Sequence, residues 1–219
     1  FMLQPLITAL EVDKSNNLWV GTTDGLVYYE INNQLSDRLT QDNGLAGNDI
    51  TAIYCDSKNK IWVGARGKGI STIDGVDIQK LDLNTKISPT SIIEDQKGNI
   101  WIGTEGKGVI VYNGKEVIAK YGSKDGLLSD YISLLNIDND GAIWIGTNKG
   151  LNKFNPVEQK FYSYNQKMGY VGIESKNNAT YKDKDGSLWF GTIKGVVKLN
   201  TNKLHDNKLE PLTQITRFR

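Results

Sequence analysis

The chain has 219 residues, and its 26 lysine and arginine residues are balanced by 25 aspartate and glutamate residues. A nucleic-acid-binding protein usually carries a basic excess or stripe, so this composition argues against that class. No apolar run approaches the roughly 18 residues that span a bilayer, and the single cysteine, Cys55, excludes an internal disulfide.

Four short strands are the first elements that the sequence predicts. They lie at Ile7 to Val12, Asn17 to Thr22, Leu26 to Ile31 and roughly Leu35 to Thr40. The segments are rich in β-branched and aromatic residues and are separated by clusters of Asn, Asp, Lys and Gly, which are typical of turns. No window carries an apolar period of 3.6 residues long enough for a helix, so the unit is predicted to be all-β.

The same unit then recurs four more times along the chain. Each copy carries one tryptophan, and the tryptophans are 43, 39, 43 and 45 residues apart. An aspartate stands six residues before each tryptophan and a glycine two residues after it. The pairs are Asp13 and Trp19, Asp56 and Trp62, Asp95 and Trp101, Asp138 and Trp144, and Asp183 and Trp189. A four-stranded repeat of about 40–45 residues is typical of a propeller blade.

The predicted fold is therefore an all-β β-propeller of five four-stranded antiparallel blades, either complete or part of a larger propeller. We expect one domain over residues 1–219, with repeats at about 5–46, 47–86, 87–128, 129–173 and 174–219.

The tryptophan strand indicates how the blades should pack. Leu18 to Val20 is a continuous apolar run, and a strand that is apolar on both faces must be covered on both faces. Two neighbouring blades supply that cover, so the tryptophans are expected in the interfaces between blades. An array that stayed open would expose two apolar faces, so we expect either a compact five-bladed ring, with 211–218 as an outer strand of the fifth blade, or self-association.

The aspartates have two interpretations. Asp138 to Gly141 and Asp183 to Gly186 resemble the start of a calcium-binding EF-hand loop. Position twelve of such a loop needs a glutamate, and it is occupied here by Lys149 and Lys194. The favoured interpretation is therefore that aspartate accepts backbone hydrogen bonds in its own turn, with no metal.

A ligand site is expected where loops converge. The loop after each tryptophan strand and the connection between blades should share one face, and loops held by a rigid scaffold are the usual place for binding. The candidate ligand-binding residues are Arg66, Lys68, Glu105, Lys107, Lys149 and Lys194, with Tyr131 and Tyr170 as aromatic rings for stacking on a sugar. The alternative is that the lysines are solvated turn residues and the tyrosines are packing residues.

Three stretches point to a known family. Asp95 to Val109, Asp125 to Ile132 and Asn43 to Ile50 resemble the two-component regulator propeller repeat. The resemblance implies a periplasmic or extracellular sensor region of a hybrid two-component histidine kinase, with an oligosaccharide as its ligand. The lysines of the loops, if they form a basic ring, would suit an acidic sugar. Residues 210–219 look like the start of an Ig-like domain, so a neighbouring propeller or Ig-like domain is an expected partner.

No cofactor and no catalytic activity are expected. His205 is the only histidine, and the sequence has no nucleophile, phosphate-loop or zinc motif. The alternatives are a propeller enzyme, either glycan-active or similar to streptogramin lyase, and a protein-binding scaffold. The lyase would need a catalytic histidine on the loop face.

Overall fold

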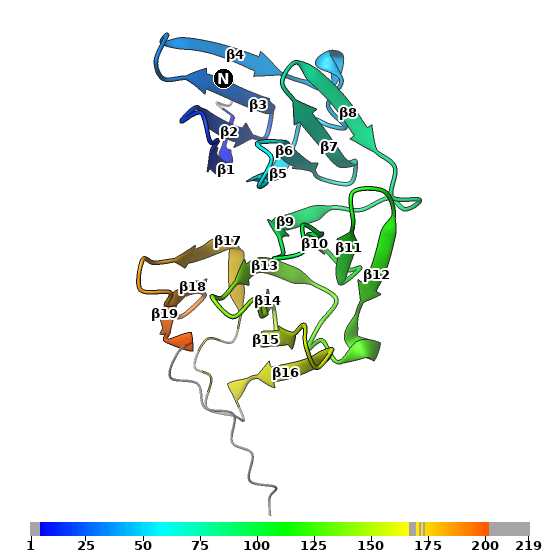
Figure 1. The fold of residues 1–219 in the computed structure, drawn as a ribbon, viewed down its shortest axis with the longest axis vertical. Coiled ribbons are helices and arrows are strands. Elements are labelled where there is room, and N and C mark those ends of the chain that lie inside the picture. The colour runs from blue at the N-terminus through cyan, green and yellow to red at the C-terminus, as the bar shows by residue number, and fades with distance from the viewer. Residues whose placement is uncertain (1–4, 167–169, 171, 173, 202–219) are drawn as a thin grey trace, which may run out of the picture.

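The computed structural model describes residues 5–166, 170, 172 and 174–201. Five antiparallel sheets, each one blade, are arranged around a central axis as a β-propeller (Figure 1). The first four sheets have four strands each, and three strands of the fifth lie within the described residues. Strands that follow one another in sequence pair within each sheet, so every blade is a simple meander.

The strands of the first two blades are β1 (Ile7–Val12), β2 (Leu18–Thr22), β3 (Gly25–Glu30), β4 (Leu35–Leu39), β5 (Ile50–Cys55), β6 (Ile61–Ala65), β7 (Gly69–Asp74) and β8 (Asp77–Leu81). Those of the third and fourth are β9 (Pro89–Glu94), β10 (Ile100–Thr104), β11 (Val109–Tyr112), β12 (Val117–Tyr121), β13 (Ile132–Ile137), β14 (Ile143–Thr147), β15 (Gly150–Asn155) and β16 (Lys160–Tyr164). The fifth blade has β17 (Ser175–Lys182), β18 (Leu188–Thr192) and β19 (Gly195–Leu199).

The predicted fold class is confirmed. The four strands expected in the first unit agree with β1 to β4 to within one residue at each end. The only named helical elements in the described part of the chain are two short 3-10 turns, η1 (Gln41–Asn43) and η2 (Ser123–Asp125), which lie in connections between blades. The expected outer strand at 211–218, the Ig-like start at 210–219 and His205 lie outside the described residues.

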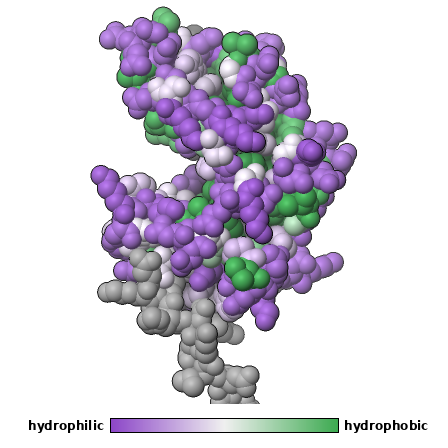
Figure 2. Space-filling model, in the orientation of Figure 1, coloured by the Kyte–Doolittle hydropathy of each residue, from purple (hydrophilic) through white to green (hydrophobic). Residues whose placement is uncertain are grey.

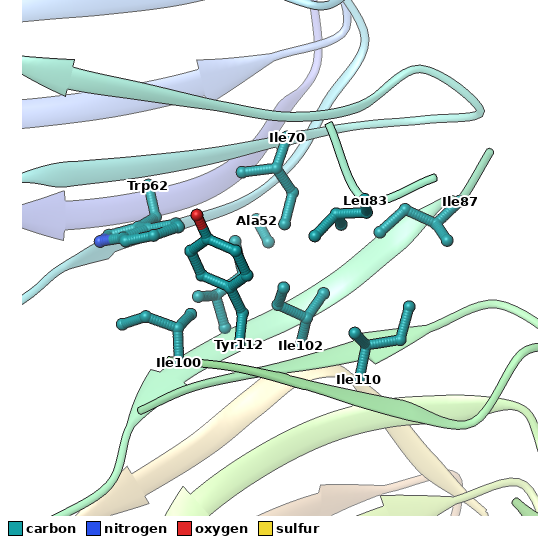
Figure 3. Close-up of a cluster of buried hydrophobic side chains, with 10 residues drawn as sticks. Ala52, Trp62, Ile70, Leu83, Ile87, Ile100, Ile102, Ile110 and Tyr112 are labelled. Atoms are coloured by element: carbon teal, nitrogen blue, oxygen red, sulfur yellow. The ribbon is translucent and has the colours of Figure 1, made fainter. Parts of the chain in front are cut away.

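Each of the first four tryptophans packs toward the blade that follows it. Trp62 of the second blade shares a buried cluster with Ile92, Ile100 and Ile102 of the third. Tyr112 approaches the ring of Trp62 edge-on (Figure 3). Equivalent clusters form around Trp19, Trp101 and Trp144 at the other three contacts between consecutive blades. The core is therefore a series of interfaces, each built from the tryptophan face of one blade and the aliphatic face of the next.

The glycine two residues after each tryptophan lets the next blade approach. A Cβ added at Gly103 would lie 2.7 Å from Ile132 Cγ2, closer than real Cβ contacts come. The same arrangement joins Gly21 to Ile50 at 2.8 Å, Gly64 to Pro89 at 2.7 Å and Gly146 to Ser175 at 2.6 Å. In every pair the first residue of the next inner strand occupies the space that a side chain would fill. This column is thus required by packing between blades.

The aspartate column positions the tryptophans. Asp138 Oδ1 accepts the backbone N–H of Ala142 at 2.8 Å, and its Oδ2 accepts the indole N–H of Trp144 at 2.8 Å. The indole hydrogen bond recurs in all five blades at 2.8–3.0 Å. In the first blade burial acts to raise the pKa of Asp13, but hydrogen bonds from Asn17 and Trp19 outweigh burial and lower it. The six-residue spacing therefore reflects a bond that fixes each indole in the interface.

The five blades follow an arc around the axis. The inner strands contact one another in chain order, β1 with β5, β5 with β9, β9 with β13 and β13 with β17. A notch separates the first blade from the fifth (Figures 1 and 2). Within the described residues, the blades thus leave one aliphatic face and one tryptophan face without a neighbouring blade.

Candidate functional site

The loops expected on one face do lie together. In the first, second, third and fifth blades, the loop that follows the tryptophan strand donates a backbone hydrogen bond to a connection between blades. Examples are Gly25 N–H to Asn48 O at 2.7 Å, Arg66 N–H to Asp49 O at 2.8 Å, Glu105 N–H to Ser88 O at 3.0 Å and Ile193 N–H to Glu174 O at 3.0 Å. We call this end of the propeller the loop face. Because its backbone groups are paired, its side chains stand on a fixed frame.

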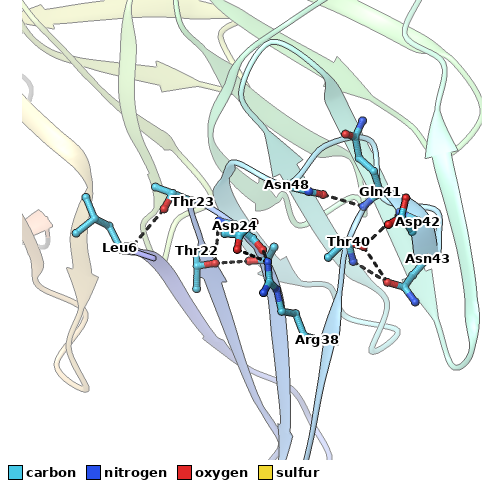
Figure 4. A network of polar contacts seen from close by, with 11 residues as sticks. Leu6, Thr22, Thr23, Asp24, Arg38, Thr40, Gln41, Asp42, Asn43 and Asn48 are labelled. Atoms are coloured by element: carbon cyan, nitrogen blue, oxygen red, sulfur yellow. Dashed lines mark hydrogen bonds and ion pairs between the residues drawn. The ribbon is translucent and has the colours of Figure 1, made fainter. Parts of the chain in front are cut away.

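The first connection shows how side chains add to this frame (Figure 4). Thr40 caps η1, and Asn48 Oδ1 accepts the backbone N–H of Gln41 at 2.8 Å. Asp24, the acidic residue at the position where the other units have lysine, forms an ion pair with Arg38. The charge in the loop of the first blade is therefore already paired within the blade.

A group of charged and aromatic residues lies where the second, third and fourth blades meet. Arg66 Nε donates to Asp49 Oδ2 at 2.8 Å, and Arg66 Nη1 lies 3.6 Å from Glu105 Oε2. Glu105 forms a β-bridge with Tyr131, whose side chain is 54% exposed. We call Asp49, Arg66, Glu105 and Tyr131 the loop-face cluster. It brings together three of the predicted residues, and Asp49 is the member that sequence reasoning missed.

The loop after β10 holds this cluster in place. Gly106 and Gly108 both donate their N–H groups to Asp130 O, at 3.1 and 2.9 Å. Gly108 has a φ of +67°, and a Cβ added there would lie 2.0 Å from Tyr121 O, so only glycine fits. A Cβ added at Gly106 would lie 3.6 Å from Tyr131 Cζ, so this glycine is close to the tyrosine. The loop is one residue longer than those of the first, fourth and fifth blades, and it holds Glu105 in a backbone bridge with the exposed Tyr131.

The predicted lysines occupy different environments. Lys107 Nζ donates to Thr85 Oγ1 at 2.8 Å and to Lys86 O at 2.7 Å, so it fastens the connection between the second and third blades. The stem of Lys68 passes against Gly47. Lys149 and Lys194 use their backbone N–H groups to bond the threonine that ends the preceding strand. The lysines thus act in separate local turns.

Tyr170 has a packing environment. It is partly buried against the cluster of Trp144 and Phe190, and burial raises the pKa of its hydroxyl. The hydroxyl oxygen is buried without a hydrogen-bond partner among the described residues. The structure therefore places Tyr170 between the fourth and fifth blades, away from the exposed ring of Tyr131.

A cavity of about 560 Å³ lies along the central axis and was not predicted from the sequence. The inner strands line it, with Asn136, Asn178 and Tyr181 among the polar groups. Burial raises the pKa of Glu11 to about 7, and a hydrogen bond from the backbone of Cys55 offsets part of that rise. On each inner strand, one residue pairs with the tryptophan of the next strand. That residue is polar in some blades, as Asn136 is in the fourth, and it is Ile93 in the third. This variation is the only signal in the sequence, and it does not reveal a cavity.

Among the described residues, no three His, Cys, Asp or Glu side chains lie close enough to hold a metal ion. In the same residues, no helix has the length and apolar character needed to cross a membrane.

The fold and the repeated Asp, Trp and Gly columns define a β-propeller built from tryptophan-containing blade repeats. Residues 44–67, 82–106, 126–149 and 173–194 match the two component regulator propeller family. These four matches confirm the predicted resemblance of the repeats to that family. No curated protein matches the chain.

Solved structures with the same fold include two from B. thetaiotaomicron. The extracellular domain of BT3049, described as a hybrid two component system, superposes with a TM-score of 0.81 at 22% identity, over 90% of this chain and 28% of that one. The extracellular domain of BT4673, described as a one component system, gives 0.77 at 24% identity, over 90% and 30%. This chain thus spans less than a third of those chains. A catalytically inactive virginiamycin B lyase from Staphylococcus aureus gives 0.67 at 16% identity, over 90% and 73%, and shares the fold.

Proposed function

We propose that this chain is a non-catalytic, ligand-sensing module of an extracytoplasmic two-component signalling protein, and that it binds an oligosaccharide at the loop-face cluster. The sensor role is supported by the family of the repeats and by the fold shared with extracellular domains of two component systems. The location of the site is supported by one observation: the exposed residue Tyr131 is bridged through its backbone to Glu105, whose side chain pairs with Arg66.

This combination of groups suits a sugar. The apolar face of a pyranose ring packs on an aromatic side chain, and its hydroxyl groups need both donors and acceptors at the rim. Arg66 offers a planar set of donors, and Glu105 offers two acceptor oxygens. Both side chains are about half exposed, so they remain accessible while their ion pair keeps them oriented.

The local charge bears on which sugar fits. Arg66 is shared by Asp49 and Glu105, so the cluster has no uncompensated positive charge, and Lys107 is occupied by the connection beside it. We therefore expect neutral oligosaccharides to bind more tightly than acidic ones.

The test is calorimetry or thermal-shift measurement with panels of neutral and acidic oligosaccharides. A ligand at 100 times its dissociation constant should stabilise the protein by about 2.7 kcal/mol. Tyr131→Ala should abolish the shift, and Tyr181→Ala, which removes an exposed tyrosine of the central cavity, should leave it intact. Loss of binding on Tyr181→Ala alone would place the ligand in the cavity, and turnover of a bound sugar would contradict a non-catalytic role.

A further inference from the structure

A second cavity, of about 470 Å³, lies between the first and second blades. Residues of the β1–β2 turn and of the β7–β8 turn line it, so it lies at the end of the blades opposite the loop face. Its walls include the rings of Trp19 and Tyr28, whose centroids are 4.6 Å apart. The carboxylates of Asp13 and Asp37 line it as well. The cavity is therefore separate from the loop-face cluster.

One row of side chains brings most of these groups together. Trp19, Tyr28 and Asp37 pair directly across β2, β3 and β4, so their side chains point to the same face of the first blade. In the fourth and fifth blades the residue opposite the tryptophan is a lysine, Lys153 or Lys198. The first blade thus has a second aromatic ring where those two blades have a cationic side chain.

The two lysines show what an indole and its aspartate bind in this fold. Lys198 Nζ lies 4.9 Å from the centre of the Trp189 ring and 3.4 Å from Asp183 Oδ2. Lys153 Nζ lies 5.7 Å from the centre of the Trp144 ring. An ammonium group is attracted by the face of an aromatic ring, and a carboxylate beside the ring adds to that attraction. The chain therefore already uses an ammonium group as the partner of these groups.

The first blade has the same acceptors without a cation of its own. Among the described residues that line its cavity, none is lysine, arginine or histidine. Lys60 and Lys97 line the corresponding cavity between the second and third blades, and Lys97 lines that between the third and fourth. In the part of the chain that the structure describes, no ion pair joins Asp13 or Asp37 to a cationic side chain.

The cavity combines a negative field with an apolar wall. Burial raises the pKa of the Tyr28 hydroxyl, and the negative charges of Glu30 and Asp13 raise it further. The second blade contributes apolar side chains, among them those of Ile73 and Val76. A negative field favours a positive charge, and the apolar wall favours methyl and methylene groups. The two properties are found together in an organic cation.

We propose that this cavity binds a small organic cation, a molecule with a quaternary or primary ammonium group. The ammonium group would pack on the aromatic wall formed by Trp19 and Tyr28, where the charges of Asp13 and Asp37 attract it. The carbon groups of the ligand would contact the apolar side chains of the second blade. Because the cavity and the loop-face cluster lie at opposite ends of the blades, the organic cation and an oligosaccharide would not compete.

The test compares choline with its neutral isostere dimethylbutanol, in which carbon replaces the quaternary nitrogen. Each is titrated into the 219-residue chain while the indole N–H signals of the five tryptophans, assigned by triple-resonance NMR, are followed. Choline should shift the signal of Trp19 more than that of any other tryptophan, and the shift should saturate. Choline should bind roughly tenfold more tightly than the isostere, because only choline is attracted by the rings and carboxylates.

Three variants make the result specific. Tyr28→Lys gives the first blade the side chain that the fifth blade has at Lys198, so the ammonium group of the chain itself should fill the site and abolish choline binding. Asp37→Asn should weaken choline binding about fivefold and leave binding of the isostere unchanged. Asp140→Asn removes an exposed carboxylate from a turn of the fourth blade and should bind choline like the unaltered chain.

Circular dichroism checks that each variant is folded, and Tyr28→Leu, which removes the ring, replaces Tyr28→Lys if the latter unfolds. The absence of a saturable shift at Trp19, or equal binding of choline and dimethylbutanol, would overturn the proposal. Choline binding that survives the change at Tyr28, or a loss in Asp140→Asn as large as that in Asp37→Asn, would overturn it as well.

Discussion

The equivalent tryptophans of the fourth and fifth blades allow a direct test of interface packing. Trp144 is fully buried between β15 and the fifth blade. Trp189 occupies the same position in the fifth blade, whose tryptophan face has no neighbouring blade among the described residues. Both indoles donate to an aspartate at 2.8 Å. Trp144→Ala and Trp189→Ala therefore remove the same type of hydrogen bond from sites that differ in their cover by a following blade.

The magnitude follows from burial. Truncation of a buried tryptophan costs about 3–5 kcal/mol, and Trp144 should lie at the upper end because Asp138, itself buried, also loses a partner. Trp189 loses contacts only within its own blade, so we expect a cost of about 1–3 kcal/mol. For a domain of this size, about 2 kcal/mol of difference corresponds to roughly 4–8 °C in Tm.

The assay is urea and thermal unfolding followed by circular dichroism, at protein concentrations low enough that the variants sediment as monomers. A third variant, Trp62→Ala, tests generality, because Trp62 is buried in the second interface in the same way as Trp144. Equal costs for Trp144→Ala and Trp189→Ala would refute the reasoning, because packing against the following blade would then contribute nothing measurable.

Three further changes test other parts of the structure. The raised pKa of Glu11, about 7 against 4.5 when unfolded, means that the folded state retains its proton longer, so stability should fall as pH rises from 4.5 to 7; Glu11→Gln should flatten that slope in thermal melts. Gly108→Ala should lower the urea midpoint more than Gly67→Ala, because both glycines have a positive φ but only a Cβ at Gly108 would clash with a backbone oxygen. An equal loss of urea midpoint in the two variants would show that this clash has no measurable cost. Asn178→Ala should cost about 1–2 kcal/mol in chemical denaturation, because Asn178 has a φ of +54° and its amide donates to the inner strand of the second blade at 2.8 Å.

The repeat explains why most of the fold could be predicted. The spacing of Trp19, Trp62 and the later tryptophans fixes the length of a blade, and the alternation of strand and turn residues fixes its four strands. The roles of the repeated glycine and aspartate positions could not be predicted in the same way. Glycine is a common turn residue, and only the structure shows that the glycine after each tryptophan makes room for a residue of the next blade, such as Ile50 or Ile132. The aspartate was expected to close its own turn, and its bond to the indole six residues later needed geometry as well.

The candidate site was predicted in part for the same reason. Arg66 and Glu105 stood out because their loops have one residue more than the others. Both loops donate backbone hydrogen bonds to connections between blades, as expected if loops and connections share a face. Asp49 lies in a connection between blades, and nothing in its local sequence distinguishes it from a turn aspartate. The side chains of lysines with the same place in the repeat differ in surroundings, as Lys107 demonstrates, because each connection between blades has its own sequence.

Equivalent positions show the limit of any inference made one repeat at a time. Ile7 and Ile132 have the same place in their blades and the same apolar character, yet Ile7 is 66% exposed and Ile132 is 2% exposed. Ile132 packs over Gly103 of the third blade, whereas no described residue of another blade covers Ile7 in the same way. In a repeat protein each unit contributes half of each interface, so the burial of a residue depends on the unit beside it. The repeat pattern therefore predicts which side chains face a neighbouring blade, and only the arrangement of the blades shows which of them are buried.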